Sequence, residues 1–86
     1  MAKYNVDIKR SAVKEIERLP RKEILIILDK ISRLADEPRP ADSRKLSGQE
    51  KYRVRCGNYR ILYLIEDDIL IVYIVKVGHR KDVYRK

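Results

Sequence analysis

The first third of the chain changes from an alternating pattern to a helical one. A short strand is predicted where apolar residues alternate with polar ones, at Tyr4, Val6 and Ile8. Ser11 is placed to cap a helix that runs to about Leu19, and Pro20 interrupts the pattern. A second helix is expected at about 22–36, because its apolar residues recur at helical spacing. The two helices, joined by a tight link, are predicted to pack as a hairpin on a sheet.

The second half of the chain has the pattern of strands. Three runs rich in β-branched and aromatic residues follow one another: KYRVRC at 51–56, YRILYLIE at 59–66 and ILIVYIVKVGH at 69–79. Gly57-Asn58 and Asp67-Asp68 separate these runs, and each pair is expected to form a two-residue hairpin turn. The segment from Pro38 to Gly48 is expected to be a loop, and the one flexible segment besides the termini.

These elements predict an α+β fold in a single domain that spans residues 1–86. An N-terminal strand precedes a two-helix hairpin, a three-stranded antiparallel meander with the helices on one face, and a short C-terminal tail or helix. A chain of 86 residues has room for one domain. Since the sequence contains no Trp and no Phe, the core must be built from Ile, Leu, Val and Tyr.

The sequence favours a protein of the cytoplasm. The N-terminus MAKYNVDIKR carries charges and no apolar run, which argues against a signal peptide. The apolar stretch at 69–75 is too short to cross a bilayer. Cys56 is the single cysteine, so it cannot form an internal disulfide.

Positive charge is concentrated in the middle of the chain. The net charge is +8, and between residues 44 and 60 Glu50 is the single acidic residue. The cations of this segment are Arg44, Lys45, Lys51, Arg53, Arg55 and Arg60. A local excess of this kind attracts polyanions and speeds their capture. Scattered lysines are explained by solubility alone, whereas arginines concentrated on strands favour a binding surface.

The turn at Gly57-Asn58 determines which strand residues share a face. With a two-residue turn, Arg55 lies directly opposite Arg60, and directly opposed residues project from the same side of a sheet. Arg53 is two residues from Arg55 and therefore joins them. The opposite face, assigned to the helix-packed core, carries Val54, Cys56, Tyr59, Ile61 and Tyr63.

The second predicted turn extends this arginine face toward the C-terminus. With Asp67-Asp68 as a two-residue turn, Arg60 is expected opposite Val75. Val77 and His79 would then continue on the arginine face. The end of the last strand and the tail after it would come close to the arginines.

Crowded arginines on a sheet call for an explanation. Like charges directly opposite each other weaken a sheet unless an anion joins them, and arginine is suited to bidentate contacts with phosphate. The alternative is that each side chain reaches into water or pairs with a carboxylate such as Glu50 or Asp82. The other half of the same face is apolar and is expected to be covered by the tail or by a protein partner. Its residues are Leu62, Leu64, Ile69, Ile71 and Tyr73.

The order and spacing of these elements resemble those of RelE-family toxins, which belong to the RelE/ParE toxin superfamily. The likeness is carried by YRVRCGNYRILYLIEDD at 52–68 and VKVGHRKDVY at 75–84, preceded by KLSG at 45–48. It covers nearly the whole chain, including the order of the helix pair. The resemblance implies a type II toxin that cleaves mRNA in the ribosomal A site and is held inactive by a cognate antitoxin. Cleavage in that family proceeds by attack of the ribose 2′-hydroxyl on the adjacent phosphate, without a metal or other cofactor.

The resemblance also implies roles for particular residues. Arg60 and Arg80 match the phosphate-stabilising arginines of the family. Tyr84 matches the C-terminal tyrosine that positions the base or activates the 2′-hydroxyl. Arg53 and Arg55 match strand positions that are often lysine in the family, and they are expected to bind RNA phosphates. Further candidates for phosphate binding are Lys45, Lys51 and Arg85.

The general base is left open by the sequence. Arg55 stands where a lysine could accept a proton, but an arginine is effectively always protonated. His79 is the single histidine and titrates in the useful range, although a solvent-facing structural role is an equal alternative. Glu50 is a second candidate on a loop beside the basic strand. Lys51 is a third, but it is expected on the core side.

Other kinds of site have weaker support. Asp67 and Asp68 are explained as turn residues rather than as a metal pair. One Cys and one His far apart make no zinc site. Two other functions are alternatives: a ParE-type toxin that poisons DNA gyrase without cutting RNA, and a non-catalytic RNA-binding module. A gyrase poison has no need for the arginines together with Tyr84, so the endoribonuclease is favoured.

Overall fold

The structure is a computed structural model that describes residues 3–46 and 50–79. Two helices and five strands make up this described part of the chain. The helices are α1 (Arg10–Glu17) and α2 (Arg21–Leu34). The strands are β1 (Asn5–Ile8), β2 (Ser43–Lys45), β3 (Lys51–Cys56), β4 (Tyr59–Glu66) and β5 (Ile71–His79).

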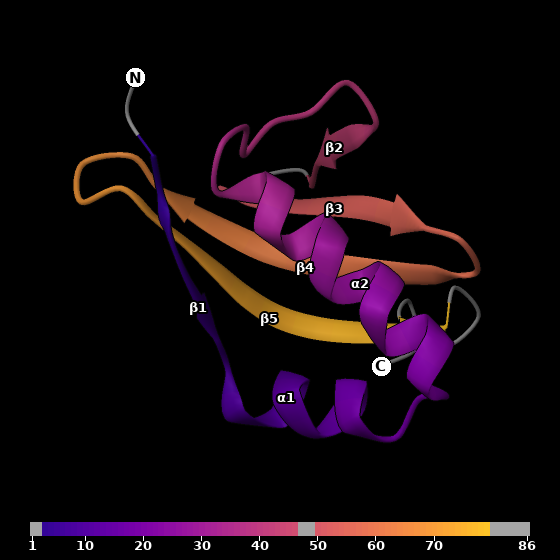
Figure 1. The fold of residues 1–86 in the computed structure, drawn as a ribbon. Coiled ribbons are helices and arrows are strands. Elements are labelled where there is room, and N and C mark those ends of the chain that lie inside the picture. The colour runs from indigo at the N-terminus through magenta and orange to yellow at the C-terminus, as the bar shows by residue number, and fades with distance from the viewer. Residues whose placement is uncertain (1–2, 47–49, 80–86) are drawn as a thin grey trace.

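The five strands form one sheet in the order β1-β5-β4-β3-β2 (Figure 1). β1 pairs with β5 in parallel, and the other neighbouring strands are antiparallel. The predicted α+β class and the meander of β3, β4 and β5 are therefore confirmed. The sheet is wider than the meander alone, because β1 joins one side and β2 the other. β2 lies in the segment that was predicted to be a loop.

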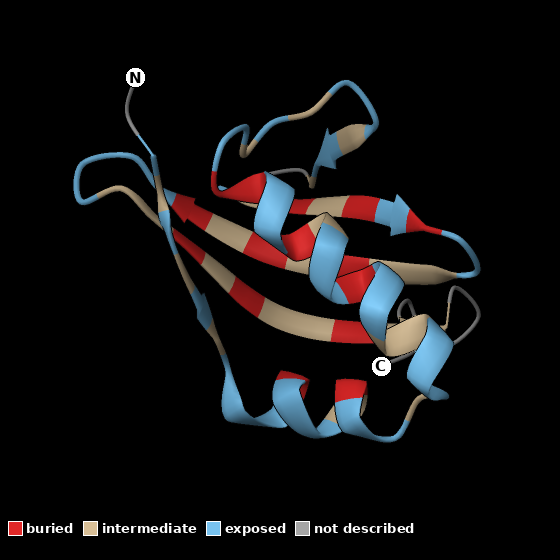
Figure 2. Cartoon of the chain, viewed as in Figure 1, coloured by how far each residue is buried: buried red, intermediate tan, exposed pale blue. Residues whose placement is uncertain are grey.

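One face of the sheet packs against α2, which lies in front of the strands in Figure 1. Buried and half-buried residues alternate along β3 and β4, as a sheet with one face in the core requires (Figure 2). Tyr63 on β4 and Ile27 on α2 are both completely buried in this core. A tyrosine thus takes the central place that Phe or Trp often fills.

Both helices begin close to their predicted positions, but α1 is not capped as expected. Lys9 takes the N-cap position without a side-chain hydrogen bond, and Ser11 lies inside the first turn. α2 begins directly after Pro20, which has no backbone N–H to bond within a helix and whose ring would clash with the carbonyl four residues earlier, so α1 does not continue through it. Ala12 and Ile16 carry the buried face of α1 into the same core.

α1 covers an edge of β5 that β1 leaves exposed. β1 pairs with residues 71–74 only, so the remainder of β5 has no strand on that side. Glu15 of α1 accepts a hydrogen bond from the backbone N–H of Val77 at 2.9 Å and forms an ion pair with Lys76 at 3.0 Å. A side-chain carboxylate therefore satisfies the backbone donor that a further strand would otherwise bond.

The connection between β4 and β5 differs from the predicted two-residue turn. Glu66 pairs with Ile71, so four residues form the turn, and Leu70 there adopts a left-handed φ of 54°. The register then shifts between Leu62 and Tyr63, which leaves Val75 as an extra residue on β5. Such a bulge reverses the alternation of the strand beyond it.

A polar network ties the turn after β4 to the segment before β2. The Arg39 guanidinium donates to both carboxylate oxygens of Asp67, at 3.2 and 2.8 Å, and its Nε donates to the Tyr52 hydroxyl at 2.9 Å. The Tyr4 hydroxyl donates to Asp67 at 2.6 Å. Hydrogen bonds from Arg39 and Tyr4 lower the pKa of Asp67 to about 2. Asp67, predicted to be only a turn residue, thus also anchors two other segments, those of Tyr4 and Arg39.

No helix of the described chain is both long and apolar enough to span a bilayer.

Candidate nucleic-acid interface

Arginines face one another on the side of the sheet opposite α2. Arg55 on β3 pairs directly with Arg60 on β4, as the two-residue turn at Gly57-Asn58 predicts. Gly57 adopts a left-handed φ of 62°, which this kind of turn requires and glycine tolerates. Arg53 lies two residues before Arg55 and shares its face. The predicted cluster of three arginines on one face is confirmed.

β2 adds a fourth arginine to this face. Arg44 pairs directly with Arg53, so the two side chains project from the same side of the sheet. The face therefore holds two directly opposed pairs of arginines, one across β2 and β3 and one across β3 and β4. This side of the sheet is the arginine face, and its four arginines are Arg44, Arg53, Arg55 and Arg60.

The arginine face lines a cleft of about 480 Å³. The other lining residues come from the chain that leads into β2, namely Ala41, Asp42 and Ser43. Arg44 and Arg55 are exposed, Arg53 and Arg60 are half-buried, and one terminal guanidinium nitrogen of Arg60 is buried. Cations on three neighbouring strands therefore converge on one open cleft.

Asp42, the one acidic residue among the described residues that line the cleft, is already paired with a lysine. It accepts a hydrogen bond from Lys30 of α2 at 2.8 Å. This bond holds the pKa of the Asp42 carboxyl below its usual value. The described lining of the cleft thus keeps its positive charge, because this carboxylate is paired outside the arginine face.

Several contacts fix the position of the chain that enters β2. The Tyr63 hydroxyl donates to the backbone carbonyl of Pro38 at 2.7 Å, and burial raises the pKa of Tyr63 to about 12. The Ser43 hydroxyl donates to the carbonyl of Pro40 at 2.7 Å. Together with the bonds of Arg39, these contacts hold a short edge strand that has little apolar surface of its own.

The two lysines predicted to bind phosphate lie away from the cleft. Lys51 pairs with Leu64, which places it on the side of the arginine face and corrects its expected position on the core side. It lies four residues before Arg55 on β3, roughly 13 Å along the strand. Lys45 pairs with Tyr52 on the other side of the sheet and forms an ion pair with Glu50 at 2.9 Å.

The structure does not place His79 on the arginine face. His79 pairs with Tyr59, and the two rings are in edge contact with centroids 5.8 Å apart. Val77, also expected there, is buried opposite Ile61. Both expectations were wrong because of the bulge at Val75, whose extra residue reverses the alternation of β5 beyond it. The four-residue turn moves the register by two residues and by itself would have kept the predicted faces. Arg60 pairs with Gly78 instead of Val75.

Glu50 is also separated from the arginine pairs. It lies at the start of β3, is exposed, and its bond from Lys45 lowers the pKa of its carboxyl. A lower pKa makes a carboxylate a weaker base. The remaining candidates, Arg80, Tyr84 and Arg85, and the alternative partner Asp82, lie outside the described residues.

Sequence reasoning missed Arg44 as a member of the site. The sequence places Arg44 in the charged segment but predicts a loop there, and a loop assigns its side chain to neither face of the sheet. The one signal in the sequence is the two-residue spacing of Arg44 and Leu46, which is the spacing of side chains on one face of a strand. In a polar segment this spacing is too weak a signal to identify a three-residue strand. Among the described residues, no group of three His, Cys, Asp or Glu side chains could hold a metal ion.

Comparison with known proteins gives a consistent result. A family model described as the ParE toxin of the type II toxin–antitoxin system parDE matches residues 6–84. The putative toxin RelE1 of Methanocaldococcus jannaschii is 31% identical over 87 residues, covering 96% of this chain and 97% of that protein. Toxin RelG of Mycobacterium tuberculosis is also 31% identical over 87 residues, with coverages of 96% and 98%.

Solved structures share the whole fold. The toxin in the RelE–RelB complex of Pyrococcus horikoshii is 30% identical, with a TM-score of 0.84, over 96% of this chain and all of that chain. The RelBE2 toxin–antitoxin complex of Mycobacterium tuberculosis contains a chain that is 28% identical, with a TM-score of 0.83 and coverages of 95% and 97%. The chain described here therefore belongs to the RelE family of toxins, within the RelE/ParE superfamily of type II toxin–antitoxin systems.

Proposed function

We propose that this toxin is an endoribonuclease that cuts mRNA on the ribosome and thereby stops translation in the cytoplasm. The observation that supports the proposal most directly is the pairing of Arg55 with Arg60 at the wall of an open cleft. Two guanidinium groups held side by side match the geometry of a phosphate group. A sheet that tolerates their mutual repulsion gains from an anion bound between them.

The proposed reaction needs charge stabilisation more than it needs a metal. The ribose 2′-hydroxyl attacks the neighbouring phosphorus, the P–O5′ bond breaks, and a 2′,3′-cyclic phosphate and a free 5′-hydroxyl form. The crowded phosphate gains negative charge as it reacts, and fixed cations stabilise that charge. Arg60 is the described residue best placed for this role, since it is half-buried and one of its nitrogens is enclosed.

Residues after β5 complete the proposed site. β5 ends at His79, and its Gly78 pairs with Arg60, so the chain leaves the sheet beside the arginine pair. Arg80 follows immediately, and we assign it the second phosphate contact, with Tyr84 acting on the 2′-hydroxyl. His79, Glu50 and Lys51 all lie away from this end of the arginine face, so the proposal gives none of them the role of general base.

A cognate antitoxin is the proposed inhibitor. The relatives from Pyrococcus horikoshii and Mycobacterium tuberculosis were solved as complexes of toxin with antitoxin. Here the half of the arginine face farther from the cleft carries half-buried apolar side chains, Leu62, Leu64, Ile71 and Tyr73 among them. No described helix covers them, and a protein partner would remove this surface from water.

Gyrase poisoning is the second candidate, because the matching family model is described as a ParE toxin. The two functions differ in what happens to RNA. A short pulse of expression in a bacterium, followed by mapping of transcript ends, separates them. The proposal predicts new 5′ ends inside translated messages; intact transcripts with a DNA-damage response would support the gyrase alternative instead.

Substitution of Arg60 or Arg80 tests whether these residues contact the phosphate. Arg60→Ala and Arg80→Ala should each reduce the rate of mRNA cleavage by about 10²-fold or more, the usual cost of losing one group that stabilises a charged transition state. Cleavage is measured on ribosomes programmed with a defined message, and circular dichroism checks the fold. Arg10→Ala, on α1, which lies on the other side of the molecule from β2 in Figure 1, is the control and should keep full activity; Arg10 does not line the cleft. Full activity in Arg60→Ala would contradict the phosphate role.

A further inference from the structure

The arginine face is wider than one phosphate needs. Arg60 lies on β4 and Arg44 on β2, two strand spacings apart, which is roughly 10 Å across the sheet. In the proposed function the phosphate at the cleaved bond contacts only the pair at one side, Arg55 and Arg60. The cleft continues past that pair to Arg44 and to the chain at 41–43.

The second pair repeats the arrangement of the first. Arg44 and Arg53 are directly opposed, as Arg55 and Arg60 are. Within the described part of the chain, the side chain of Arg44 makes no hydrogen bond or ion pair. It is exposed and lies directly opposite another arginine, which costs stability in a sheet.

The backbone that carries Arg44 is held in place before any ligand arrives. Lys30 binds Asp42 at 2.8 Å, and the Ser43 hydroxyl binds the carbonyl of Pro40 at 2.7 Å. β2 then pairs with β3 over its three residues. Because the strand is already ordered, binding at Arg44 needs only the side chain to become fixed, which keeps the entropic cost small.

We propose that Arg44 and Arg53 bind a second phosphate of the same RNA strand, next to the phosphate held by Arg55 and Arg60. The RNA backbone then crosses β4, β3 and β2 in turn on a diagonal, because the two pairs lie two residues apart along β3. This inference deepens the proposed function and rests on it. It gives the toxin a binding subsite one nucleotide away from the bond that is cut, and it makes Arg44 a positioning residue for the RNA.

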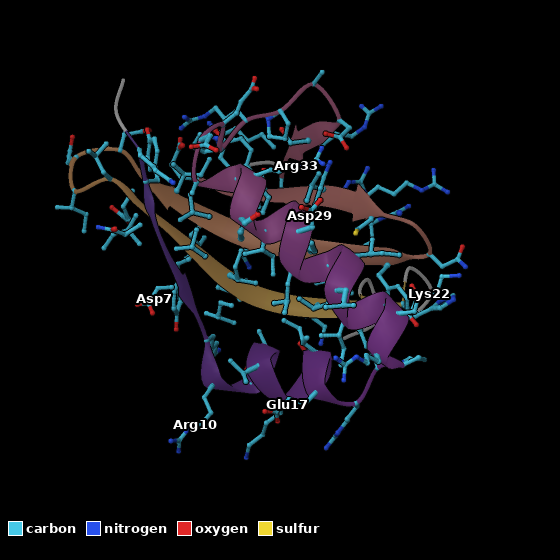
Figure 3. The ribbon with its side chains drawn as sticks, in the orientation of Figure 1. Asp7, Arg10, Glu17, Lys22, Asp29 and Arg33 are labelled. Carbon is cyan, nitrogen blue, oxygen red and sulfur yellow. The ribbon has the colours of Figure 1, made fainter. Side chains whose placement is uncertain are left out.

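The salt dependence of RNA binding tests the proposal. The probe is a single-stranded RNA octanucleotide with 2′-O-methyl groups, which cannot be cut because the attacking hydroxyl is blocked. Each phosphate contact contributes about 0.7 to the slope of log Kd against log salt for a single strand. Arg44→Gln should lower that slope by about 0.7 and raise Kd about tenfold at low salt. Arg10→Gln removes the same charge from an exposed site on α1, distant from β2, and should leave the slope unchanged (Figure 3).

A second variant guards against an effect on folding. Arg44→Thr places a residue with high strand propensity at the same site and should match Arg44→Gln in slope and Kd. If wild-type protein binds the probe and cuts mRNA on the ribosome, but both Arg44 variants behave like Arg10→Gln, the second phosphate site is disproved and the proposed nuclease stands. If wild-type protein neither binds the probe nor cuts mRNA, both the nuclease and the subsite are disproved.

Discussion

Single residues on the arginine face are arranged at a cost in stability. Arg55 and Arg60 oppose each other at the end of the β3–β4 hairpin, so their positive charges repel each other. Neither side chain is fully buried, so burial of apolar surface does little to offset this repulsion. Opposed like charges on a sheet reduce stability by a few tenths of a kcal/mol up to about 1 kcal/mol. The same two residues are the ones that the proposed function needs. A substitution there should therefore move stability and function in opposite directions.

Arg55→Thr is expected to stabilise the fold. The change removes a cation opposite Arg60 and supplies a β-branched residue, so the free energy of unfolding should rise by about 0.5 kcal/mol at low salt. Urea unfolding measures this gain, and RNA binding should weaken in the same protein. In 1 M salt the Debye length is only about 3 Å, so most of the electrostatic gain should disappear. A variant less stable than wild type at low salt would contradict the argument.

Asp67 should make the stability of the toxin depend on pH in the acid range. Its folded pKa is about 2, because Arg39 and Tyr4 donate hydrogen bonds to its carboxylate. A carboxyl whose pKa is lowered by folding stabilises the protein above its unfolded value, near 4, and loses that contribution as the pH falls toward 2. Urea midpoints measured at pH 5, 4, 3 and 2 should therefore fall more steeply in wild type than in Asp67→Asn.

The neighbouring turn residue provides the control for this pH dependence. Asp68→Asn removes the same charge from the same turn without touching the bonds from Arg39 and Tyr4 to Asp67. Its urea midpoints should fall with pH as steeply as those of wild type. An equal flattening in both variants would show that overall charge, and not the network of Asp67, sets the acid stability.

At the scale of elements, α1 acts as a substitute for a missing strand. β1 ends after pairing with residues 71–74, and Glu15 then satisfies the edge of β5 through the N–H of Val77 and the ammonium of Lys76. This clamp holds β5 just beyond the bulge at Val75. β5 ends at His79, two residues after Val77, so the clamp holds the end of the strand that precedes Arg80 in the sequence.

Variants of Glu15 separate the two contacts of this clamp. Glu15→Gln keeps an oxygen that can accept from Val77 but loses the ion pair with Lys76, so it should cost less than about 1 kcal/mol. Glu15→Ala leaves a partly buried N–H without its acceptor and should cost about 1–3 kcal/mol. Urea unfolding and amide hydrogen exchange at Val77 measure both effects. Glu17→Ala, at an exposed site of α1 labelled in Figure 3, is the control; a loss there equal to that of Glu15→Ala would refute the clamp.

Elements with strong local chemistry were predictable from the sequence, and those defined by distant contacts were not. Gly57 has the backbone freedom that its turn requires, and so the register of β3 and β4 and three of the four arginines followed from the sequence. The turn before β5 depends on Leu70 in a left-handed conformation, which an ordinary leucine does not reveal. Val75 bulges within an unbroken apolar run, where no residue marks the shift. The predicted face of the sheet for His79 was therefore wrong, although its predicted place in the last strand was right.

At the scale of the whole molecule, the candidate site depends on contacts that cross the core. The cleft is lined by residues of β2, β3 and β4, but β2 contributes only three residues and little burial. Its place is determined by the chain before it, which is bonded to Tyr63 inside the core and to Asp67 at the far turn. The prediction of a flexible loop failed because these partners lie 25 and 28 residues away along the chain.

Removal of one buried hydroxyl should show this dependence. Tyr63→Phe keeps the ring in the core but leaves the carbonyl of Pro38 without its donor, so the free energy of unfolding should fall by about 1 kcal/mol. Because Pro38 begins the chain that leads into β2, the amide of Ser43 should exchange its hydrogen faster, and RNA should bind more weakly, although no arginine has changed. Tyr73→Phe, on the opposite face of the sheet, is the matched control and should leave both measurements near wild type. If Tyr63→Phe lost stability but bound RNA as tightly as wild type, β2 would hold its position without the core, and the site would be a property of the hairpin alone.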